Sequence, residues 1–207
     1  VFLRGDQTCS FDFAEQAGDG WAYTWQVPRD DFDHALARGA QEQGVLYFFD
    51  HTVVDVKVGA EPSLTVRDPD GETRQIRSRF IIDASGYGRV LPRLLDLNTP
   101  SALPKRTALF SHVVGDVRPT GAAEGRIWII AHQPDVWLWL IPFSNGKTSL
   151  GVVGPPSFFD DFEGSRTDCL METLRANPAC AARLVGAEVV FEPHRIDGYS
   201  IGVKRLF

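Results

Sequence analysis

Residues 136–153 restrict the fold of this chain more than any other segment. Two apolar runs, at 136–143 and 148–153, flank the dipeptide Asn145-Gly146, which is the strongest signal for a β-hairpin turn in the sequence. More strand-like runs precede this hairpin, at 107–116 and 126–132. Successive strands joined by short turns predict an antiparallel sheet in the second half of the chain.

The first half mixes helix and strand signals. Pro28, with Asp30 and Asp31 after it and Gly44 further on, predicts a helix that begins near residue 29. Its apolar positions share one face, which we expect to pack inward: Phe32, Ala35, Leu36, Gly39 and Ala40. Strands are expected at 21–27, 45–49, 52–58, 63–67 and 73–82, with a turn at Asp68-Pro69-Asp70-Gly71 and a short helix at 90–95.

Helix signals return near the end of the chain. Ser165 and Asp168 have the spacing of a capping box, so a helix should follow them and stop at Asn177-Pro178. A last strand is expected over 188–199. The character of the sequence shifts near 100–105, which predicts a fold of the α/β to α+β class, with residues 1–100 mixed and residues 101–207 forming an antiparallel sheet with flanking helices.

Composition and charge exclude several function classes. The formal net charge of −6 opposes a phosphate backbone, so nucleic acid is not an expected partner. No apolar run approaches the roughly 20 residues of a membrane span, and Val1–Arg4 does not resemble a signal peptide. The three cysteines lack zinc or disulfide spacing, which favours a reducing cytoplasm. No metal site, Gly-x-Ser-x-Gly elbow or P-loop is found.

The segment Trp137–Pro142 is the strongest candidate for chemistry. On a strand, the period of two places Trp137, Trp139 and Ile141 on one face, ahead of Pro142. One interpretation is a central strand buried on both faces. The other is a pocket wall, because adjacent tryptophans need acceptors for their indole N–H groups.

Two other segments carry polar side chains at element boundaries. Gln26 and Arg29 flank the start of the first expected helix, where they suit either a bound cofactor or an ordinary charged surface. Asp83, Ser85 and Gly86 begin a small-residue loop that suits a ribose or pyrophosphate, although it lacks the third glycine of a dinucleotide fingerprint. Among the histidines, His112 and His132 lie on expected strands and either face a substrate or are structural.

Taken in order, these segments resemble the flavin-dependent halogenases, within the larger class of FAD-dependent aromatic hydroxylases and geranylgeranyl-reductase-like enzymes. Trp137-x-Trp139-x-Ile141-Pro142 matches the family's WxWxIP motif in full. The resemblance implies that Gln26 and Arg29 lie along the flavin and that Val53 meets the adenine. It also implies that the Asp83-x-Ser85-Gly86 loop lies near the cofactor.

The resemblance further implies an activity. Reduced FAD from a separate flavin reductase, oxygen and halide would give hypohalous acid, which reaches a lysine and then an aromatic or carrier-tethered substrate. Trp137 and Trp139 would keep the organic substrate away from the flavin. A flavin monooxygenase or reductase of the same fold is the first alternative, and a non-catalytic β-rich binding module is the second.

The resemblance spans nearly this whole chain but only about the middle half of such an enzyme. Residues 1–100 then correspond to a remnant of the FAD-binding domain, and residues 101–207 to the substrate domain. The Gly-x-Gly-x-x-Gly turn, the later Gly-Asp segment and the catalytic lysine have no counterpart in this sequence, and that lysine would lie just upstream of Val1. We therefore expect the chain alone to be inactive, and we assign no catalytic residue.

Overall fold

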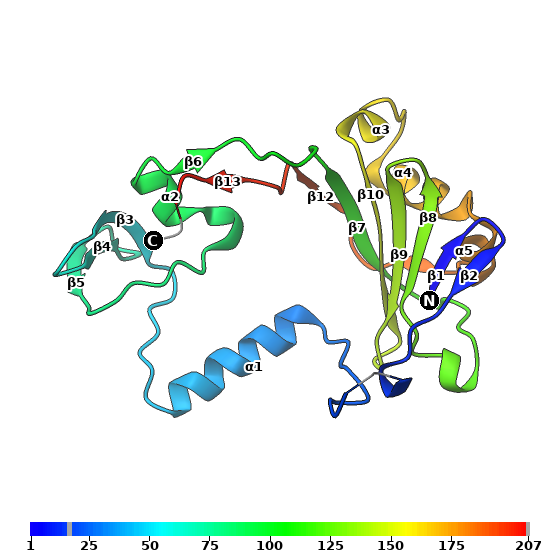
Figure 1. Cartoon of the computed structure of the whole chain (residues 1–207), viewed down its shortest axis with the longest axis horizontal. Coiled ribbons are helices and arrows are strands. Elements are labelled where there is room, and N and C mark those ends of the chain that lie inside the picture. The colour runs from blue at the N-terminus through cyan, green and yellow to red at the C-terminus, as the bar shows by residue number, and fades with distance from the viewer. Residues whose placement is uncertain (16–17, 206–207) are drawn as a thin grey trace. The chain divides into compact units, whose positions relative to one another are not determined.

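The computed structural model describes residues 1–15 and 18–205 (Figure 1), and they form two compact units. Unit 1 contains Val1–Phe32 and Pro104–Tyr199, and unit 2 contains Asp33–Leu103 with the stretch that begins at Ser200. Several sheets and a few helices make up the described residues, which confirms the expected mixed class. The assignment of residues 1–100 and 101–207 to two functional domains stays a prediction.

Unit 1 is built on an eight-stranded sheet among the described residues. Its strands are β1 (Phe2–Arg4), β2 (Gln7–Cys9), β7 (Thr107–Val114), β8 (Trp128–Gln133), β9 (Val136–Pro142), β10 (Lys147–Gly154), β11 (Glu188–Val189) and β12 (His194–Asp197). The order is β11-β7-β10-β9-β8-β1-β2, with β12 also paired to β7. Every pair is antiparallel apart from β1 with β8. The expected antiparallel sheet is confirmed.

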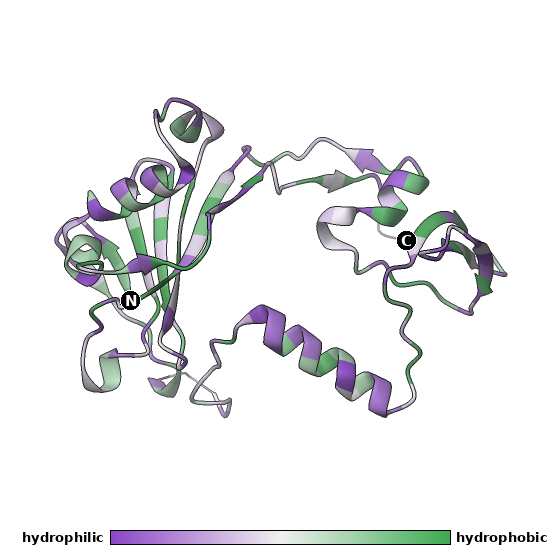
Figure 2. Cartoon of the chain, turned by 180° about the vertical axis from the view of Figure 1, so that it is seen from behind, coloured by the Kyte–Doolittle hydropathy of each residue, from purple (hydrophilic) through white to green (hydrophobic). Residues whose placement is uncertain are grey.

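One face of this sheet carries the core of unit 1. The helices α3 (Pro156–Asp160), α4 (Arg166–Arg175) and α5 (Pro178–Arg183) follow β10 in the chain, and α4 contacts β7 and β10. Large, fully buried side chains come from β8, β9, β10, α4 and the end of α5: Ile130, Leu138, Leu140, Leu150, Leu170, Leu174 and Leu184. Figure 2 shows green, apolar positions along these strands, whereas the helices carry both apolar and hydrophilic positions. Burial of such side chains, worth about 1.5–3 kcal/mol each, anchors the helices to the sheet.

The capping box before α4 is present. The Ser165 hydroxyl accepts a hydrogen bond from the Asp168 N–H at 3.1 Å, and the Asp168 carboxylate accepts from the Ser165 N–H at 3.1 Å. Asn177 then accepts N–H groups at the start of α5, so Asn177-Pro178 ends one helix and begins the next. These local interactions confirm the signals read from the sequence.

Unit 2 contains a three-stranded antiparallel sheet and a short two-stranded one among its described residues. Its strands are β3 (Thr52–Lys57), β4 (Ser63–Arg67), β5 (Thr73–Arg77), β6 (Asn98–Thr99) and β13 (Gly202–Val203), and its short helix is α2 (Val90–Leu94). At the β4–β5 turn, Gly71 has a φ of +89° and Asp68 accepts two backbone N–H groups. The predicted hairpin is confirmed.

The remaining helices are α1 (Arg29–Glu42) and the 3₁₀ turns η1 (Phe13–Glu15), η2 (Gly86–Gly88) and η3 (Gly121–Ala123). The expected start and end of α1 are confirmed, and Gly44 has a φ of +91°. The expectation that one face of α1 packs inward is wrong for the described structure. Phe32 and Leu36 are 43% and 58% exposed, and no residue of α1 is buried.

Several expected strands are absent or shorter. Residues 21–27 and 45–49 form no strand, and the strand expected at 73–82 ends at Arg77. The strand expected at 188–199 is divided into β11 and β12. An extended segment becomes a strand only when a neighbour receives its backbone hydrogen bonds. The described residues supply no such neighbour to 21–27 or 45–49.

No helix in the described part of the chain is both long and apolar enough to cross a membrane.

Candidate functional site

The WxWxIP segment forms β9, near the middle of the sheet of unit 1. Val136, Leu138 and Leu140 point into the core and are at most 2% exposed, whereas Trp137 on the other face is 38% exposed. We call this other face the open face of the sheet. The strand is therefore buried on one face only within the described structure, and the tryptophans lie on the opposite one.

Strand register gathers one row of side chains on the open face. Trp139 lies opposite Ile129 on β8 and Gly151 on β10. Gly151 in turn lies opposite Phe110 on β7, which lies opposite His194 on β12. Because paired residues project to the same side of a sheet, these five positions form a continuous stripe across five strands.

Trp139 is held in this row by close contacts. Its indole Nε1 donates a hydrogen bond to the Ser149 hydroxyl at 3.2 Å. A Cβ at Gly151 would lie 2.2 Å from the indole Cη2, so the ring lies against the β10 backbone. The Trp137 and Trp139 ring centroids are 5.7 Å apart. The acceptor that the sequence required for a buried indole N–H is thus present for Trp139.

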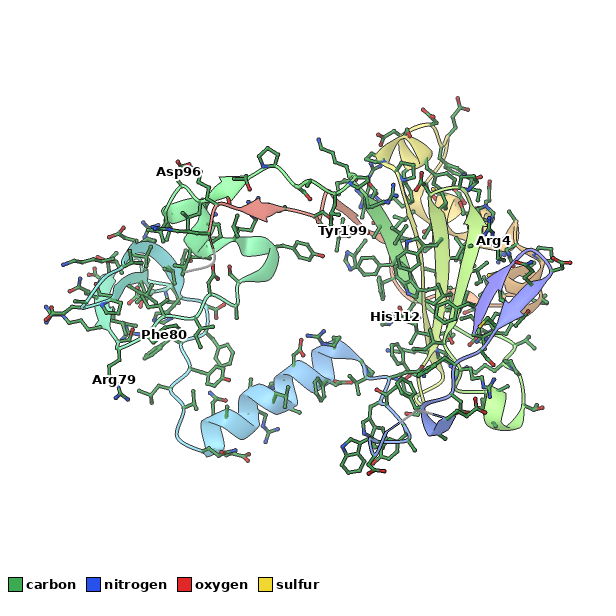
Figure 3. All side chains as sticks on the ribbon, viewed as in Figure 1. Arg4, Arg79, Phe80, Asp96, His112 and Tyr199 are labelled. Carbon is green, nitrogen blue, oxygen red and sulfur yellow. The ribbon has the colours of Figure 1, made fainter. Side chains whose placement is uncertain are left out.

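Aromatic side chains extend this cluster along β7. Phe110 lies 6.2 Å from Trp139 and 5.8 Å from His194, measured between ring centroids. His112, labelled in Figure 3, lies between the rings of Phe143 and Phe191, at 5.5 and 5.1 Å. Sequence reasoning named His112 but missed the three phenylalanines. Alternation along β7 places Phe110 beside His112, but Phe143 and Phe191 come from elements whose pairing the sequence did not specify.

Burial and the nearby charge of Lys147 lower the pKa of His112, and Asp30 acts in the opposite direction. Burial also lowers the pKa of His132. These shifts favour the neutral form of both imidazoles, and a neutral imidazole both donates and accepts one hydrogen bond.

Gln26 and Arg29 belong to unit 1. The Gln26 amide donates from Nε2 to the Gly125 carbonyl at 2.7 Å, and its Oε1 is buried without a hydrogen-bond partner among the described residues. Arg29 is the first residue of α1. A polyhydroxylated cofactor such as FAD fits this unpaired acceptor, because a hydroxyl donor would satisfy it.

Val53, Asp83, Ser85 and Gly86 belong to unit 2, so they are described separately. The Asp83 carboxylate accepts the Ser85 and Leu91 backbone N–H groups, both at 2.9 Å. Partial burial raises the pKa of Asp83, but these hydrogen bonds and that of the Ser85 side chain outweigh it, and the pKa is lowered. The carboxylate therefore stays charged near neutral pH.

The same loop leaves room for a ligand at its glycine. Gly86 has a φ of +54°, and no atom lies within 4 Å of a Cβ built there. The Ser85 hydroxyl accepts the Val90 N–H at 2.9 Å, which fixes the loop to α2. Val53 lies half-buried on β3, opposite Val66. The loop thus has the small, open backbone that close approach of a cofactor requires.

A separate cavity lies on the helix-covered side of unit 1. It measures about 300 Å³ and is lined by Leu109, Phe159, Asp160, Phe162, Gly164, Ser165, Arg166, Cys169 and Arg195. None of the predicted site residues lines this cavity. Within the described residues, no cluster of histidine, cysteine and acidic side chains has the makings of a metal site.

Comparison with known proteins identifies one family. A model of the family described as tryptophan halogenase matches residues 7–185. The 1H-pyrrole-2-carbonyl-[peptidyl-carrier protein] brominase of Pseudoalteromonas luteoviolacea is 31% identical over 140 residues, which cover 67% of this chain and 34% of that protein. The flavin-dependent halogenase armH3 of Armillaria mellea is 28% identical, over 87% of this chain and 40% of that protein.

Solved structures agree with this match. A flavoprotein/dehydrogenase from Cytophaga hutchinsonii superposes with a TM-score of 0.92 at 43% identity, and covers 100% of this chain and 51% of its own. The flavin-dependent halogenase CmlS gives a TM-score of 0.84 at 28% identity, over 98% of this chain and 38% of its own. The chain therefore spans between about a quarter and a half of the proteins it matches.

Proposed function

The chain belongs to the tryptophan halogenase family, and on this premise we propose that the intact protein halogenates an electron-rich aromatic substrate with reduced FAD, oxygen and halide. The observation that carries the proposal is the pair of tryptophans on the open face of β9, within a complete WxWxIP motif. Two relatives are named as a brominase and a chlorinase of a carrier-bound pyrrole. We extend that class to this protein: a phenol, pyrrole or indole, either free or tethered to a carrier protein.

We propose cofactor contacts in each unit separately. Gln26 offers an unpaired acceptor and Arg29 a cation in unit 1. In unit 2, the family resemblance implies that the Val53 backbone meets the adenine. The loop of Asp83, Ser85 and Gly86 has an open backbone at Gly86 that a ligand could approach closely. When bound and reduced, FAD would supply two electrons to oxygen and halide would supply two more, so that halide would become hypohalous acid and the second oxygen atom would leave as water.

The tryptophans act by size. Trp137 and Trp139 present two large rings side by side at the surface, and Ile141 and Pro142 continue the apolar wall. A wall of this kind excludes an aromatic substrate from the flavin while a halide or hypohalous acid passes. Exclusion of the substrate suppresses direct oxygen transfer, and so favours halogenation over hydroxylation.

The proposal includes a partner. The family resemblance implies that the enzyme uses FAD that is already reduced. We therefore expect a separate flavin reductase to deliver reduced FAD. A cytoplasmic location stays a prediction from the sequence.

The test is an assay of the intact protein with FAD, a flavin reductase, NADH and bromide. The substrate panel contains phenols, pyrroles and indoles, free and carrier-bound, and products are read by mass spectrometry. We expect a product with the paired isotope peaks of bromine. A Trp137→Ala variant should divert part of the turnover to hydroxylated product, and a Val114→Ala variant on β7 is the control. Hydroxylated product alone from the wild-type protein would refute the halogenase proposal.

A second candidate function has its own observation. The structure with 43% identity is described as a flavoprotein/dehydrogenase, not as a halogenase. A flavin-dependent dehydrogenase or reductase would oxidise NADH or NADPH by itself. Steady pyridine-nucleotide oxidation by the intact protein, with no added reductase and no halide requirement, would favour this candidate.

A further inference from the structure

Gly151 of β10 makes an unusually close approach to the indole of Trp139. A Cβ built at Gly151 would lie 2.2 Å from Cη2, 2.3 Å from Cζ2 and 2.7 Å from Cζ3 of that ring. Carbon atoms in contact are normally about 3.5–4.0 Å apart. The six-membered part of the indole therefore occupies the space that any other residue at position 151 would fill.

A second contact fixes the five-membered part of the same indole. The Trp139 Nε1 donates to the Ser149 hydroxyl at 3.2 Å. Ser149 and Gly151 are two residues apart on β10, so both lie on the open face. One strand thus supplies a hydrogen bond to the polar edge of the indole and an empty position for its apolar edge.

Neighbouring rings limit sideways movement of the indole. Trp137 lies 5.7 Å away and Phe110 lies 6.2 Å away, both measured between ring centroids. An indole displaced from Gly151 therefore has to lift away from the sheet. Trp137 differs, because the residue opposite it on β10 is Val153, which carries a Cβ.

We propose that Gly151 and Ser149 are positioning residues for Trp139: together they keep its indole flat on the sheet and so set the size limit of the wall. This inference rests on the proposed function, in which that wall keeps the organic substrate from the flavin. Gly151→Ala should lift the indole and narrow or misplace the passage beside it, while the core on the other face is unaffected.

The first experiment measures the position of Trp139 directly. The intact protein is labelled with fluorotryptophan, and the Trp139 fluorine resonance is assigned by its loss in Trp139→Leu. We expect Gly151→Ala to shift this resonance. The matched control is Gly154→Ala on the same strand, whose added Cβ would meet Val136 and Phe159 but not Trp139. An unchanged Trp139 resonance in Gly151→Ala would overturn the proposal.

The second experiment measures the consequence as the ratio of halogenated to hydroxylated product. We expect Gly151→Ala to lower this ratio, with a loss of halogenation turnover on the order of 10- to 100-fold, because misplacement by about 1 Å can cost this much. When Trp139 is already replaced in Trp139→Leu, adding Gly151→Ala should not change the product ratio or the halogenation turnover further. An equal loss in both backgrounds would show that Gly151 does not act through Trp139.

A second variant and the resonance measurements separate failure of this inference from misfolding and from failure of the proposed function. If Gly151→Ala does not fold, Ser149→Ala adds no volume and still removes the indole hydrogen bond, so it should shift the Trp139 indole N–H resonance. An unshifted resonance there would contradict the role of Ser149. If the protein does not halogenate at all, the proposed function fails, while the two resonance measurements still decide whether β10 positions Trp139.

Discussion

Arg183 on α5 donates from Nη2 to the Asp116 carboxylate at 2.6 Å, and their side chains are only 4% and 1% exposed. Arg118 and the Thr148 hydroxyl share the other carboxylate oxygen, at 3.2 and 2.8 Å. Arg183 also lies over the Trp128 ring, 4.7 Å from its centroid, with Nε and Nη1 unpaired among the described residues. A single carboxylate therefore joins β10, α5 and the segment that follows β7.

Loss of this carboxylate should destabilise unit 1. Asp116→Asn leaves the Arg183 charge buried and uncompensated, for which we expect a loss of about 3–5 kcal/mol in the free energy of unfolding. The control is Asp135→Asn. Asp135 forms an ion pair with Arg106, and its side chain is 67% exposed, so the loss in the free energy of unfolding should stay below about 1 kcal/mol. Denaturant unfolding measures both. Equal losses would contradict the structural role of Asp116.

The same pair predicts a pH dependence. Burial raises the pKa of Asp116, but hydrogen bonds from Arg183, Thr148 and Arg118 and the charge of Arg183 outweigh it and hold the pKa below its ordinary value. The stabilisation is therefore present above about pH 4, the ordinary range of aspartate, and is lost as pH falls through the lowered native pKa. Unfolding measured from neutral to acidic pH should show wild type and Asp116→Asn converging in the acid.

His112 should titrate below the ordinary range of histidine. Its pKa is lowered first by burial and then by Lys147, so its stabilising effect is present above about pH 6.5 and is lost as pH falls from there toward the lowered native pKa. Lys147→Met should raise the pKa of His112 without restoring its ordinary value, because burial remains. An NMR titration of the imidazole measures the pKa of His112 in the wild-type protein and in Lys147→Met. A native value at or above about 6.5 would contradict the burial of His112 between two rings.

Cys180 should be inert in the native protein. It is 0% exposed, and burial raises the pKa of its thiol to about 12, so almost no thiolate forms near neutral pH. Cys9 is exposed and should react with a maleimide. Peptide mass spectrometry after brief labelling should find Cys9 modified and Cys180 unmodified, whereas denaturant should expose both. Native labelling of Cys180 would refute its burial.

Gly146 should be required for the β9–β10 hairpin. Its φ of +83° lies in a region that other residues enter at a cost of about 1–2 kcal/mol, so Gly146→Ala should lower the stability of unit 1 by that amount. Gly125→Ala is the matched control, because a Cβ there would meet no atom within 4 Å. Thermal unfolding compares the two. Unchanged stability in Gly146→Ala would contradict the prediction and would mean that the turn adopts another backbone conformation without cost.

Local signals determined several elements from the sequence alone. The Asn145-Gly146 turn, the Asp68–Gly71 turn and the Ser165 capping box depend on backbone preferences and on contacts within a few residues. The mixed fold class and the family motif also follow from order along the chain. None of these features depends on contacts between residues that are far apart in the sequence.

Tertiary structure decided everything that depends on a distant partner. The sequence placed strands at 21–27 and 45–49, where the residue types favour strands but the described residues supply no neighbouring strand. It placed Trp137 and Trp139 on one face, but only the pairing of β9 with β10 brought Gly151 under Trp139. Likewise, Asp116 and Arg183 are 67 residues apart and meet only once α5 packs on the sheet. Strand register and burial arise from the whole fold, and a local pattern does not contain them.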